Sequence, residues 1–466
     1  MKILVDCTDI AFHGGNTGIR RVAHNLARHA VAVGDILHFD AHLVARFPAI
    51  GFVRLEDPSL EGLGQAVGAV RLLAYHGRTP RRFRRLCGTL FRPLGLQCWI
   101  ERQWRGPGKL LLIAALLAPV YVATIVAMLV APWLPPPDGA VEPEPGDVLT
   151  IPGSSWWGPQ MRGIIPRLRR GGVHVVPLIH DLFPVTLPEV AREDLIDSFR
   201  GNIGPLLANS ALVLANSRFT ADQVEAYIRR NGIRPAPAVD VFRMGIELDL
   251  AESAAGLRDD LADFFARGPT FLAVGTVEPR KNYDVLLDAF ELGERSGRPF
   301  QLVIAGKHGW KSERLRKRIE SLTAAGFPLR WFKDLSDSEL AWCYQNARAL
   351  IYPSIAEGFG LPLLEALLQG CPVLASDLPV FREIGADHCR YFSPRDAESL
   401  ARMVEQSLID PPPRPQVKWP DWRESALEFF GKIRRHFQDG PAYTSRGQGC
   451  SDQSRRLFAN SRVEKT

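Results

Sequence analysis

The chain has 466 residues, of which 46% are hydrophobic and 23% are charged, and its formal net charge at pH 7 is +6. It is about three times as long as a typical domain, and its composition excludes an intrinsically disordered protein. Its seven cysteines form no Cys-x-x-Cys pair and have no histidine at metal-ligand spacing, so the sequence indicates neither a disulfide framework nor a zinc site.

The first predicted elements are a strand at residues 3–6 and a helix that follows a glycine-rich loop. No signal-peptide pattern precedes the strand, so we expect the first domain to stay in the cytosol. Gly15 and Gly18 lie in the loop, and Arg21 follows on the helix. The glycines do not form the Gly-x-Gly-x-x-Gly fingerprint, but Asp40 lies at the spacing of a ribose-binding acid, so a nicotinamide-binding fold is a weak alternative.

An arginine-rich segment and an uncharged apolar segment come next. The first begins at Arg78, and the second, residues 110–134, is long enough for a helix to cross a bilayer. Pro119 could divide it into two half-helices that enter and leave the same leaflet, with the arginines at the cytosolic headgroups. The arginines lack aromatic stacking partners, which argues against nucleic acid. We expect a membrane-associated insert at about 78–147, re-entrant or monotopic; a buried soluble hairpin and a true span are the alternatives.

Short α/β units follow the insert. Strands are predicted at residues 148–151, 173–179 and 211–215, and Ser217 is the predicted N-cap of the helix after the third. His180 comes directly after the second of these strands. Because ligands of open α/β sheets bind beyond the carboxyl ends of the strands, His180 is a candidate site residue. A purely structural histidine is the alternative.

The second half of the chain repeats this alternation, and its first strand, residues 271–275, leads to Arg280 and Lys281. Two adjacent cations at a strand end suit a diphosphate, because arginine binds phosphate oxygens as a fork and lysine adds a mobile charge. Ser336 and Glu339 predict a capping box, so the acidic residues there indicate a helix start rather than a metal-binding Asp-x-Asp. We therefore expect no metal site.

The stretch 352–376 holds two glutamates, Glu357 and Glu365, around a glycine turn. Gly358 and Gly360 permit a close backbone approach, and a proline two positions further on suits the first turn of a helix. The N-terminus of such a helix attracts an anion such as a phosphate, and Glu365, about one turn inside it, can accept hydrogen bonds from a ribose diol. The alternative is a solvated loop glutamate and a second glutamate that only complements the helix dipole.

Residues 357–376, EGFGLPLLEALLQGCPVLAS, resemble the Glu-x7-Glu signature of the retaining glycosyltransferases of family 4, the glycosyl transferases group 1. The segments around Lys281, His180 and Gly18 resemble the family's Glu-x-Arg-Lys-Asn, His-Asp-x-x-Pro and Gly-Ile-x-Arg patterns. The resemblance is almost continuous over residues 271–405 and patchy before them. It implies the α/β GT-B fold, in which two Rossmann-like domains face a cleft.

With this fold, we expect an N-terminal acceptor-side domain at 1–250, which contains the insert, and a C-terminal nucleotide-sugar-binding domain at 251–420. A helix at 421–437 would return to the first domain, as is common in GT-B enzymes. The polar residues 438–466 show no periodicity and are predicted to be disordered.

The resemblance also implies roles for particular residues. Glu357, His180, Arg280 and Lys281 would be catalytic, with Glu357 on the hydroxyls of the transferred sugar and Glu365 on the ribose. The donor would bind at Arg280, Lys281, Glu357, Gly358, Phe359, Gly360, Leu361 and Glu365. The acceptor-side loop would contain Gly15, Gly18 and Arg21.

The implied activity is that of a retaining, metal-independent hexosyltransferase without a cofactor. It would move a sugar from a nucleotide-diphosphate sugar, GDP-mannose or similar, to a lipid-linked glycan in bacterial polysaccharide or lipopolysaccharide biosynthesis. The insert places this activity at the cytoplasmic face of the inner membrane. A GT-B sugar-nucleotide epimerase and a non-catalytic membrane scaffold are the alternatives. Residues 332–335 depart from the glycine-containing pattern usual in the family, which leaves the nucleobase open.

Overall fold

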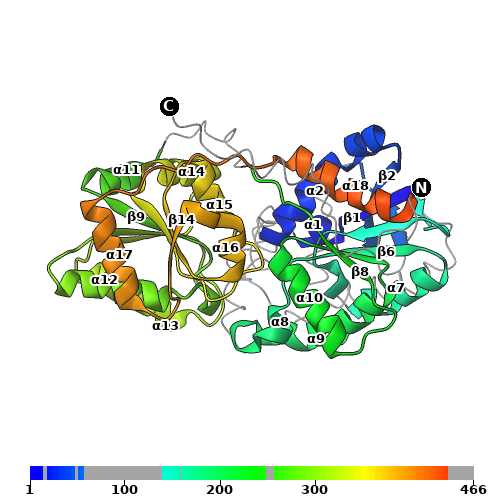
Figure 1. Cartoon of the computed structure of the whole chain (residues 1–466), viewed down its shortest axis with the longest axis horizontal. Helices are drawn as coiled ribbons and strands as arrows, with labels where there is room; N and C mark the ends of the chain where they lie inside the picture. The colour runs from blue at the N-terminus through cyan, green and yellow to red at the C-terminus, as the bar shows by residue number, and fades with distance from the viewer. Residues whose placement is uncertain (14–17, 48–50, 57–138, 158, 248–256, 439–466) are drawn as a thin grey trace, which may run out of the picture.

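The computed structural model describes residues 1–13, 18–47, 51–56, 139–157, 159–247 and 257–438. Two α/β domains lie side by side, and each is built on one sheet of mainly parallel strands (Figure 1). Gly15, the apolar segment 110–134 and most of the predicted insert lie outside the described residues. Among the helices of the described ranges, none is long and apolar enough to cross a membrane.

The first domain contains an eight-stranded sheet in the order β4-β3-β2-β1-β5-β6-β7-β8. The six neighbouring strands β2, β1, β5, β6, β7 and β8 are parallel to one another. Strands β3 and β4 add an antiparallel edge beside β2. The strands are β1 (Lys2–Asp6), β2 (Asp40–Phe47), β3 (Gly51–Arg54), β4 (Ala140–Val141), β5 (Val148–Ile151), β6 (His174–Ile179), β7 (Leu212–Ala215) and β8 (Ala238–Val241). The helices are α1 (Thr8–His13), α2 (Gly18–Leu37), α7 (Pro159–Arg170), α8 (Phe183–Thr186), α9 (Glu193–Asn209) and α10 (Arg218–Arg230).

The second domain contains a six-stranded parallel sheet in the order β11-β10-β9-β12-β13-β14, which is the strand order of a Rossmann fold. The strands are β9 (Thr270–Val274), β10 (Gln301–Ala305), β11 (Leu329–Phe332), β12 (Ala349–Tyr352), β13 (Val373–Ser376) and β14 (Cys389–Phe392). The helices are α11 (Asp259–Ala266), α12 (Tyr283–Arg295), α13 (Glu313–Ala324), α14 (Asp337–Asn346), α15 (Leu361–Leu368), α16 (Pro379–Gly385) and α17 (Ala397–Ile409). Strands β9, β12 and β13 are buried along their whole length, as expected when helices cover both faces of a parallel sheet.

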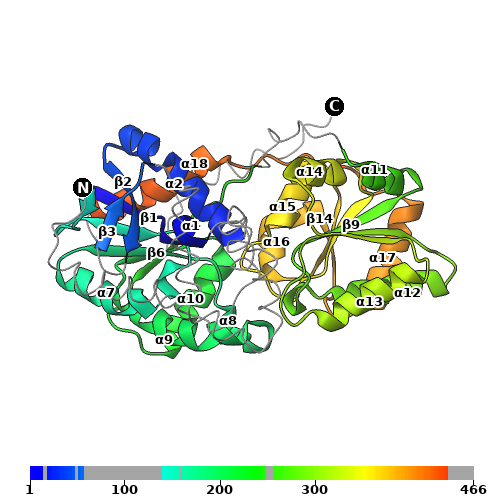
Figure 2. The ribbon, with the colours of Figure 1, turned by 180° about the vertical axis from the view of Figure 1, so that it is seen from behind.

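The last described helix, α18 (Trp422–Gln438), returns to the first domain and lies beside α2, as both ribbon views show (Figures 1 and 2). Phe430 packs against Phe39, with ring centroids 5.6 Å apart. Before the helix, Trp419 donates its indole N–H to the carbonyl of Met244 at 2.7 Å. The chain therefore crosses between the domains twice, and the second crossing is held by buried aromatic packing.

The predicted strands and the two predicted caps are confirmed. Ser217 accepts a hydrogen bond from the Thr220 N–H as the N-cap of α10, and Ser336 and Glu339 form the capping box of α14. Asp40 lies at the amino end of β2, where it pairs with His42 at 2.7 Å. A ribose acid would lie at the carboxyl end of that strand, so the nicotinamide-binding alternative is wrong.

In each sheet the strand order reverses at one topological switch point. This point lies between β1 and β5 in the first domain and between β9 and β12 in the second. The loops that follow these strands diverge there and leave a crevice at the carboxyl edge of the sheet, which is the usual ligand site of such folds. The loops after β9 and β12 carry Arg280, Lys281 and Glu357. The fold thus explains why residues that are far apart in the sequence meet.

Candidate active site between the domains

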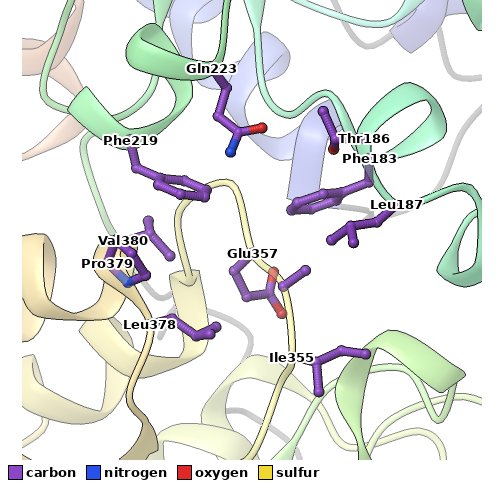
Figure 3. A pocket seen from close by; sticks show the side chains of 11 residues that line it. Phe183, Thr186, Leu187, Phe219, Gln223, Ile355, Glu357, Leu378, Pro379 and Val380 are labelled. Carbon is purple, nitrogen blue, oxygen red and sulfur yellow. The ribbon is translucent and has the colours of Figure 1, made fainter. Parts of the chain in front are cut away.

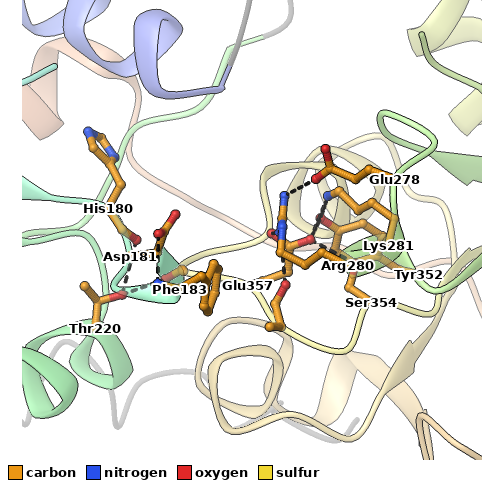
Figure 4. A network of polar contacts seen from close by, with 12 residues as sticks. His180, Asp181, Phe183, Thr220, Glu278, Arg280, Lys281, Tyr352, Ser354 and Glu357 are labelled. Atoms are coloured by element: carbon orange, nitrogen blue, oxygen red, sulfur yellow. Dashed lines mark hydrogen bonds and ion pairs between the residues drawn. The ribbon is translucent and has the colours of Figure 1, made fainter. Parts of the chain in front are cut away.

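Glu357 is the centre of a buried polar cluster at the crevice of the second domain (Figure 4). One carboxylate oxygen lies 2.5 Å from the Arg280 guanidinium, and the other lies 2.6 Å from the Lys281 ammonium. The second oxygen also accepts hydrogen bonds from the hydroxyls of Ser354, at 2.9 Å, and Tyr352, at 3.1 Å. These residues, together with Glu278, are called the Glu357 network below.

Glu278 completes the network, because it accepts a hydrogen bond from the second nitrogen of the Arg280 guanidinium at 2.9 Å. Arg280 also donates to the carbonyl of Ala356 at 3.0 Å, and its guanidinium lies 5.6 Å from the Phe183 ring of the first domain. The two cations and the two glutamates balance in charge. The sequence pattern identified Arg280, Lys281 and Glu357, but not that Glu278 and Tyr352 hold them.

The charge of Glu357 is strongly stabilised. Burial alone would raise the pKa of this carboxyl, but Arg280 and Lys281 outweigh burial and lower the pKa to about 2. Glu357 is therefore ionised at neutral pH, and its two oxygens already hold the two cations. A sugar hydroxyl that reached it would bind to a carboxylate whose position is set by four side chains.

The glycine turn after Glu357 joins the network to α15. Gly360 has a φ of 107° and is the N-cap of α15, and an added β-carbon there would lie 2.9 Å from the Phe381 ring. Phe359 is buried against Trp419, so its side chain belongs to the core. Leu361 begins the helix and lies next to Gly18 of the first domain. Any contribution of these residues to anion binding would come from their backbone N–H groups.

Glu365 lies on α15 and is paired across the two domains. Its carboxylate lies 2.7 Å from the guanidinium of Arg21, at the start of α2, and accepts a hydrogen bond from the Tyr344 hydroxyl at 3.1 Å. Burial raises the pKa of Glu365 in spite of the Arg21 charge. Arg21 also donates to the carbonyl of Glu247. The predicted ribose ligand and the predicted acceptor-side arginine thus bind each other, and a ribose would have to share Glu365 with Arg21.

The two domains touch directly at Gly358. Its carbonyl accepts hydrogen bonds from the hydroxyls of Ser217, at 2.7 Å, and Thr220, at 3.1 Å, both on the first domain. A β-carbon added to Gly358 would lie 1.9 Å from the carbonyl oxygen of His180. Glycine is therefore required here by close approach of the two domains rather than by an unusual φ.

His180 lies at the carboxyl end of β6, as predicted, but its ring is turned away from the Glu357 network (Figure 4). Its Nε2 atom donates to the carbonyl of Pro152 at 2.9 Å, which leaves Nδ1 as an acceptor. Asp181 is the neighbour that faces Arg280 and Glu357, and burial raises the pKa of its carboxyl although Arg280 opposes this. The sequence motif therefore brings a carboxyl group, as well as an imidazole, to the space between the domains.

The state of His180 predicts how stability depends on pH. Burial lowers the pKa of His180 from 6.5 to about 4, in spite of its hydrogen bond to Pro152 and the charge of Asp9. Below pH 6.5 the unfolded chain therefore binds a proton that the folded chain does not bind, so stability falls as the pH falls towards 4. From pH 6.5 to about pH 5 the free energy of unfolding should drop by about 1.5 kcal/mol through this residue.

Urea unfolding of the wild type and of His180→Gln at these two pH values measures the effect. The variant should lose this part of the pH dependence, whereas His308→Gln, at a more exposed histidine of the second domain, should keep it. An unchanged pH dependence in His180→Gln would mean that the imidazole is charged in the folded protein.

A second polar cluster, which sequence reasoning missed, lies at the crevice of the first domain. Asp6 accepts hydrogen bonds from the Thr8 and Ser155 hydroxyls, and Asp9 accepts from the backbone N–H of Ser154 at 2.7 Å and from its hydroxyl. Burial raises the pKa of Asp6. The signal for this cluster was weak, because single aspartates after a first strand are common and their partners lie about 150 positions later.

A cavity of about 220 Å³ opens beside Glu357, with walls from both domains (Figure 3). Phe183 and Phe219 of the first domain lie on opposite sides of it, and Gln223 directs its amide group into it. Ile355 and Leu378 of the second domain close the other end. Nothing in the sequence predicted this cavity, because no single segment forms it.

Comparison with known protein families finds a match within the second domain. Residues 263–418 match the family described as Glycosyl transferases group 1. The chain is similar to the serotype-specific mannosyltransferase WbdA of Escherichia coli, with 34% identity over 286 residues, which are 59% of this chain and 35% of that protein. It is also 29% identical to the O-antigen chain mannosyltransferase B of Escherichia coli over 254 residues, 54% of this chain and 63% of that protein. The chain thus spans about a third of the first relative and less than two thirds of the second.

Among solved structures, the sucrose-phosphate synthase of Thermosynechococcus elongatus has the same arrangement over 94% of this chain and 99% of its own. The TM-score is 0.55 and the identity is 20%, so the likeness concerns the fold. Together with the two sheets described above, it confirms the predicted α/β GT-B-like fold with two Rossmann-like sheets.

Proposed function

We propose that this chain is a retaining glycosyltransferase of family 4 that transfers a hexose from a nucleotide-diphosphate sugar to a glycan. The observation that carries the proposal is the Glu357 network, in which two cations lie at the crevice of a group 1 glycosyltransferase domain. The names of the two mannosyltransferase relatives favour mannose, and hence GDP-mannose as the donor. The second of these names and the predicted insert favour a lipid-linked glycan of polysaccharide or lipopolysaccharide biosynthesis as the acceptor.

The chemical step breaks the bond between the anomeric carbon and the oxygen of the β-phosphate. Positive charge develops on the sugar and negative charge on the departing diphosphate, so the residues that matter most stabilise the leaving group. Arg280, Lys281 and the N-terminus of α15 supply this stabilisation in the proposed mechanism. Because Arg280 and Lys281 also hold Glu357, the diphosphate would share these cations with the glutamate.

Retention follows if the acceptor hydroxyl attacks from the same face. Its oxygen forms the new bond to the anomeric carbon, and its proton passes to an oxygen of the departing diphosphate. Glu357 holds the hydroxyls of the transferred sugar, and Glu365 shares the ribose with Arg21. His180 is given no contact with the transferred sugar in this mechanism, because its neutral imidazole bonds to Pro152 and is turned away from Glu357. The cationic leaving-group site is the reason for proposing that no metal is needed.

The proposal is tested by incubating the full chain in detergent with GDP-, UDP- and dTDP-sugars and a bacterial lipid extract, with and without EDTA. We expect transfer from GDP-mannose at the same rate in both conditions, with an α-linked product from an α-linked donor. Loss of activity in EDTA would contradict metal independence, and an inverted linkage would contradict retention. Interconversion of free nucleotide sugars without any lipid would identify an epimerase.

We also propose that the chain acts at the cytoplasmic face of the inner membrane, with residues 110–134 as a re-entrant or monotopic anchor. The basis is their uncharged sequence and the need for both domains to form one site on one side of the membrane. Reporter fusions placed before Arg78 and after Asp147 should both report the cytosol. Reporters on opposite sides would show that the segment spans the membrane.

A further inference from the structure

We propose that the cavity between Phe183 and Phe219 is a subsite for one neutral pyranose ring of the acceptor glycan, with Gln223 as its specificity-determining residue. The inference rests on the proposed function, because it treats the first domain as the acceptor side. It specifies which kind of acceptor sugar binds next to the transferred sugar, and which residues select that acceptor sugar.

The walls of the cavity suit a sugar. A pyranose has an apolar C–H face, which packs on aromatic rings, and a rim of hydroxyls, which need partners that can both donate and accept. Phe183 and Phe219 lie on opposite sides of the cavity, and the Gln223 amide, which donates through nitrogen and accepts through oxygen, points between them (Figure 3). Glu357 at the inner end adds carboxylate oxygens that can accept hydrogen bonds, next to the proposed position of the donor's anomeric carbon.

Charge and size argue against the other ligands of this enzyme class. None of the residues that line the cavity, all of them in the described ranges, is a lysine or an arginine, and the only ionised one is Glu357. A phosphate or diphosphate would therefore find no cation in the lining of the cavity and would bind at Arg280 and Lys281 instead. The cavity, at about 220 Å³, is smaller than the roughly 300–1,000 Å³ typical of drug-sized ligands, so it fits a single ring better than an isoprenoid chain.

The walls are also held in place across the domain boundary. The backbone N–H groups of Arg218 and Phe219, at the start of α10, donate to the Glu383 carboxylate of α16 at 2.7 and 2.9 Å. Arg280 lies against the Phe183 ring, as described above. Because Glu383 binds the first N–H groups of α10, this helix is held against the second domain. Phe219 and Gln223, which lie on α10, are thereby kept at a defined distance from Glu357. The subsite therefore exists only when the two domains are together.

The test measures binding of methyl α-D-mannopyranoside and methyl α-D-glucopyranoside to the full chain by saturation-transfer NMR and calorimetry. We expect at least one glycoside to bind, and Gln223→Leu to weaken its binding about tenfold, because the hydroxyl that it held is left without a partner. Phe219→Ala should weaken it as well. Gln406→Leu is the matched control, because it makes the same chemical change at an exposed position of α17 that does not line the cavity. It should leave binding of the glycoside unchanged.

Donor binding is measured in parallel, which separates this inference from the proposed function. Gln223→Leu should keep the wild-type affinity for GDP-mannose. If the variant loses donor and glycoside affinity equally, or if GDP-mannose competes with the glycoside, the cavity holds the transferred sugar and the inference is wrong. It is also wrong if no glycoside binds, or if farnesyl phosphate binds there in a way that depends on Phe219. A wild type that binds the glycoside but no nucleotide sugar would instead contradict the proposed function.

Discussion

Replacing Gly358 with alanine is expected to lower kcat/KM by about 100-fold or more while both domains stay folded, because small misplacements of the reacting groups have effects of this size. The added β-carbon would lie 1.9 Å from the His180 carbonyl oxygen, which is backbone and cannot rotate away. The domains must then separate, which breaks the hydrogen bonds from Ser217 and Thr220 to the Gly358 carbonyl. Steady-state kinetics measure the loss, and small-angle X-ray scattering should show a larger radius of gyration.

Gly204→Ala is the matched control, because a β-carbon added there, on α9, meets no heavy atom within 4 Å. Its activity and scattering should equal those of the wild type, and its stability should be equal or slightly higher, since alanine favours a helix over glycine. Wild-type activity of Gly358→Ala would show that catalysis does not need the close contact between the two domains.

Glu357→Gln is expected to reduce activity by about 100-fold or more and to destabilise the second domain by about 3 kcal/mol, because it leaves the buried Lys281 ammonium without its anion and leaves Arg280 with Glu278 alone. The effect on stability depends on pH in a defined direction. The pKa of Glu357 is lowered to about 2 in the folded chain and is near 4.5 in the unfolded chain. The stabilisation is therefore complete above 4.5 and is lost as the pH falls towards 2, so wild type and variant should converge in acid. Thermal unfolding at pH 7 and about pH 3.5 measures this convergence.

Two further variants separate the roles of Glu357 in stability and catalysis. Glu313→Gln removes an exposed glutamate of α13 and should behave like the wild type in both measurements. The double variant Glu357→Gln/Lys281→Met removes the buried charge pair as a whole and should recover much of the lost stability, because an uncharged replacement avoids a buried unpaired ion. It should not recover activity. Recovery of activity would mean that catalysis needs neither a contact of Glu357 with the sugar nor the charge of Lys281 at the leaving group.

The local structure could be read from the sequence because its cause is local. The alternation of apolar strands and amphipathic helices predicted strands within a residue or two of β1, β5 and β9, and the hydroxyl residues Ser217 and Ser336 predicted two helix starts. The glycine turn before α15 was predicted for the same reason, since only neighbouring residues decide it. Parallel strand order then places the loops after β9 and β12 together, so Arg280, Lys281 and Glu357 could be assigned to one site.

By itself, then, the sequence determined two Rossmann-like units and the residues at the mouth of the second one. Only the tertiary structure decided which groups these residues bind, because such contacts depend on how the two domains are placed. Arg21 and Glu365 are 344 positions apart and no periodicity links them, yet they form an ion pair across the boundary. The orientation of His180 towards Pro152, and the cavity between Phe183 and Phe219, are decided in the same way, by packing between segments that share no local pattern.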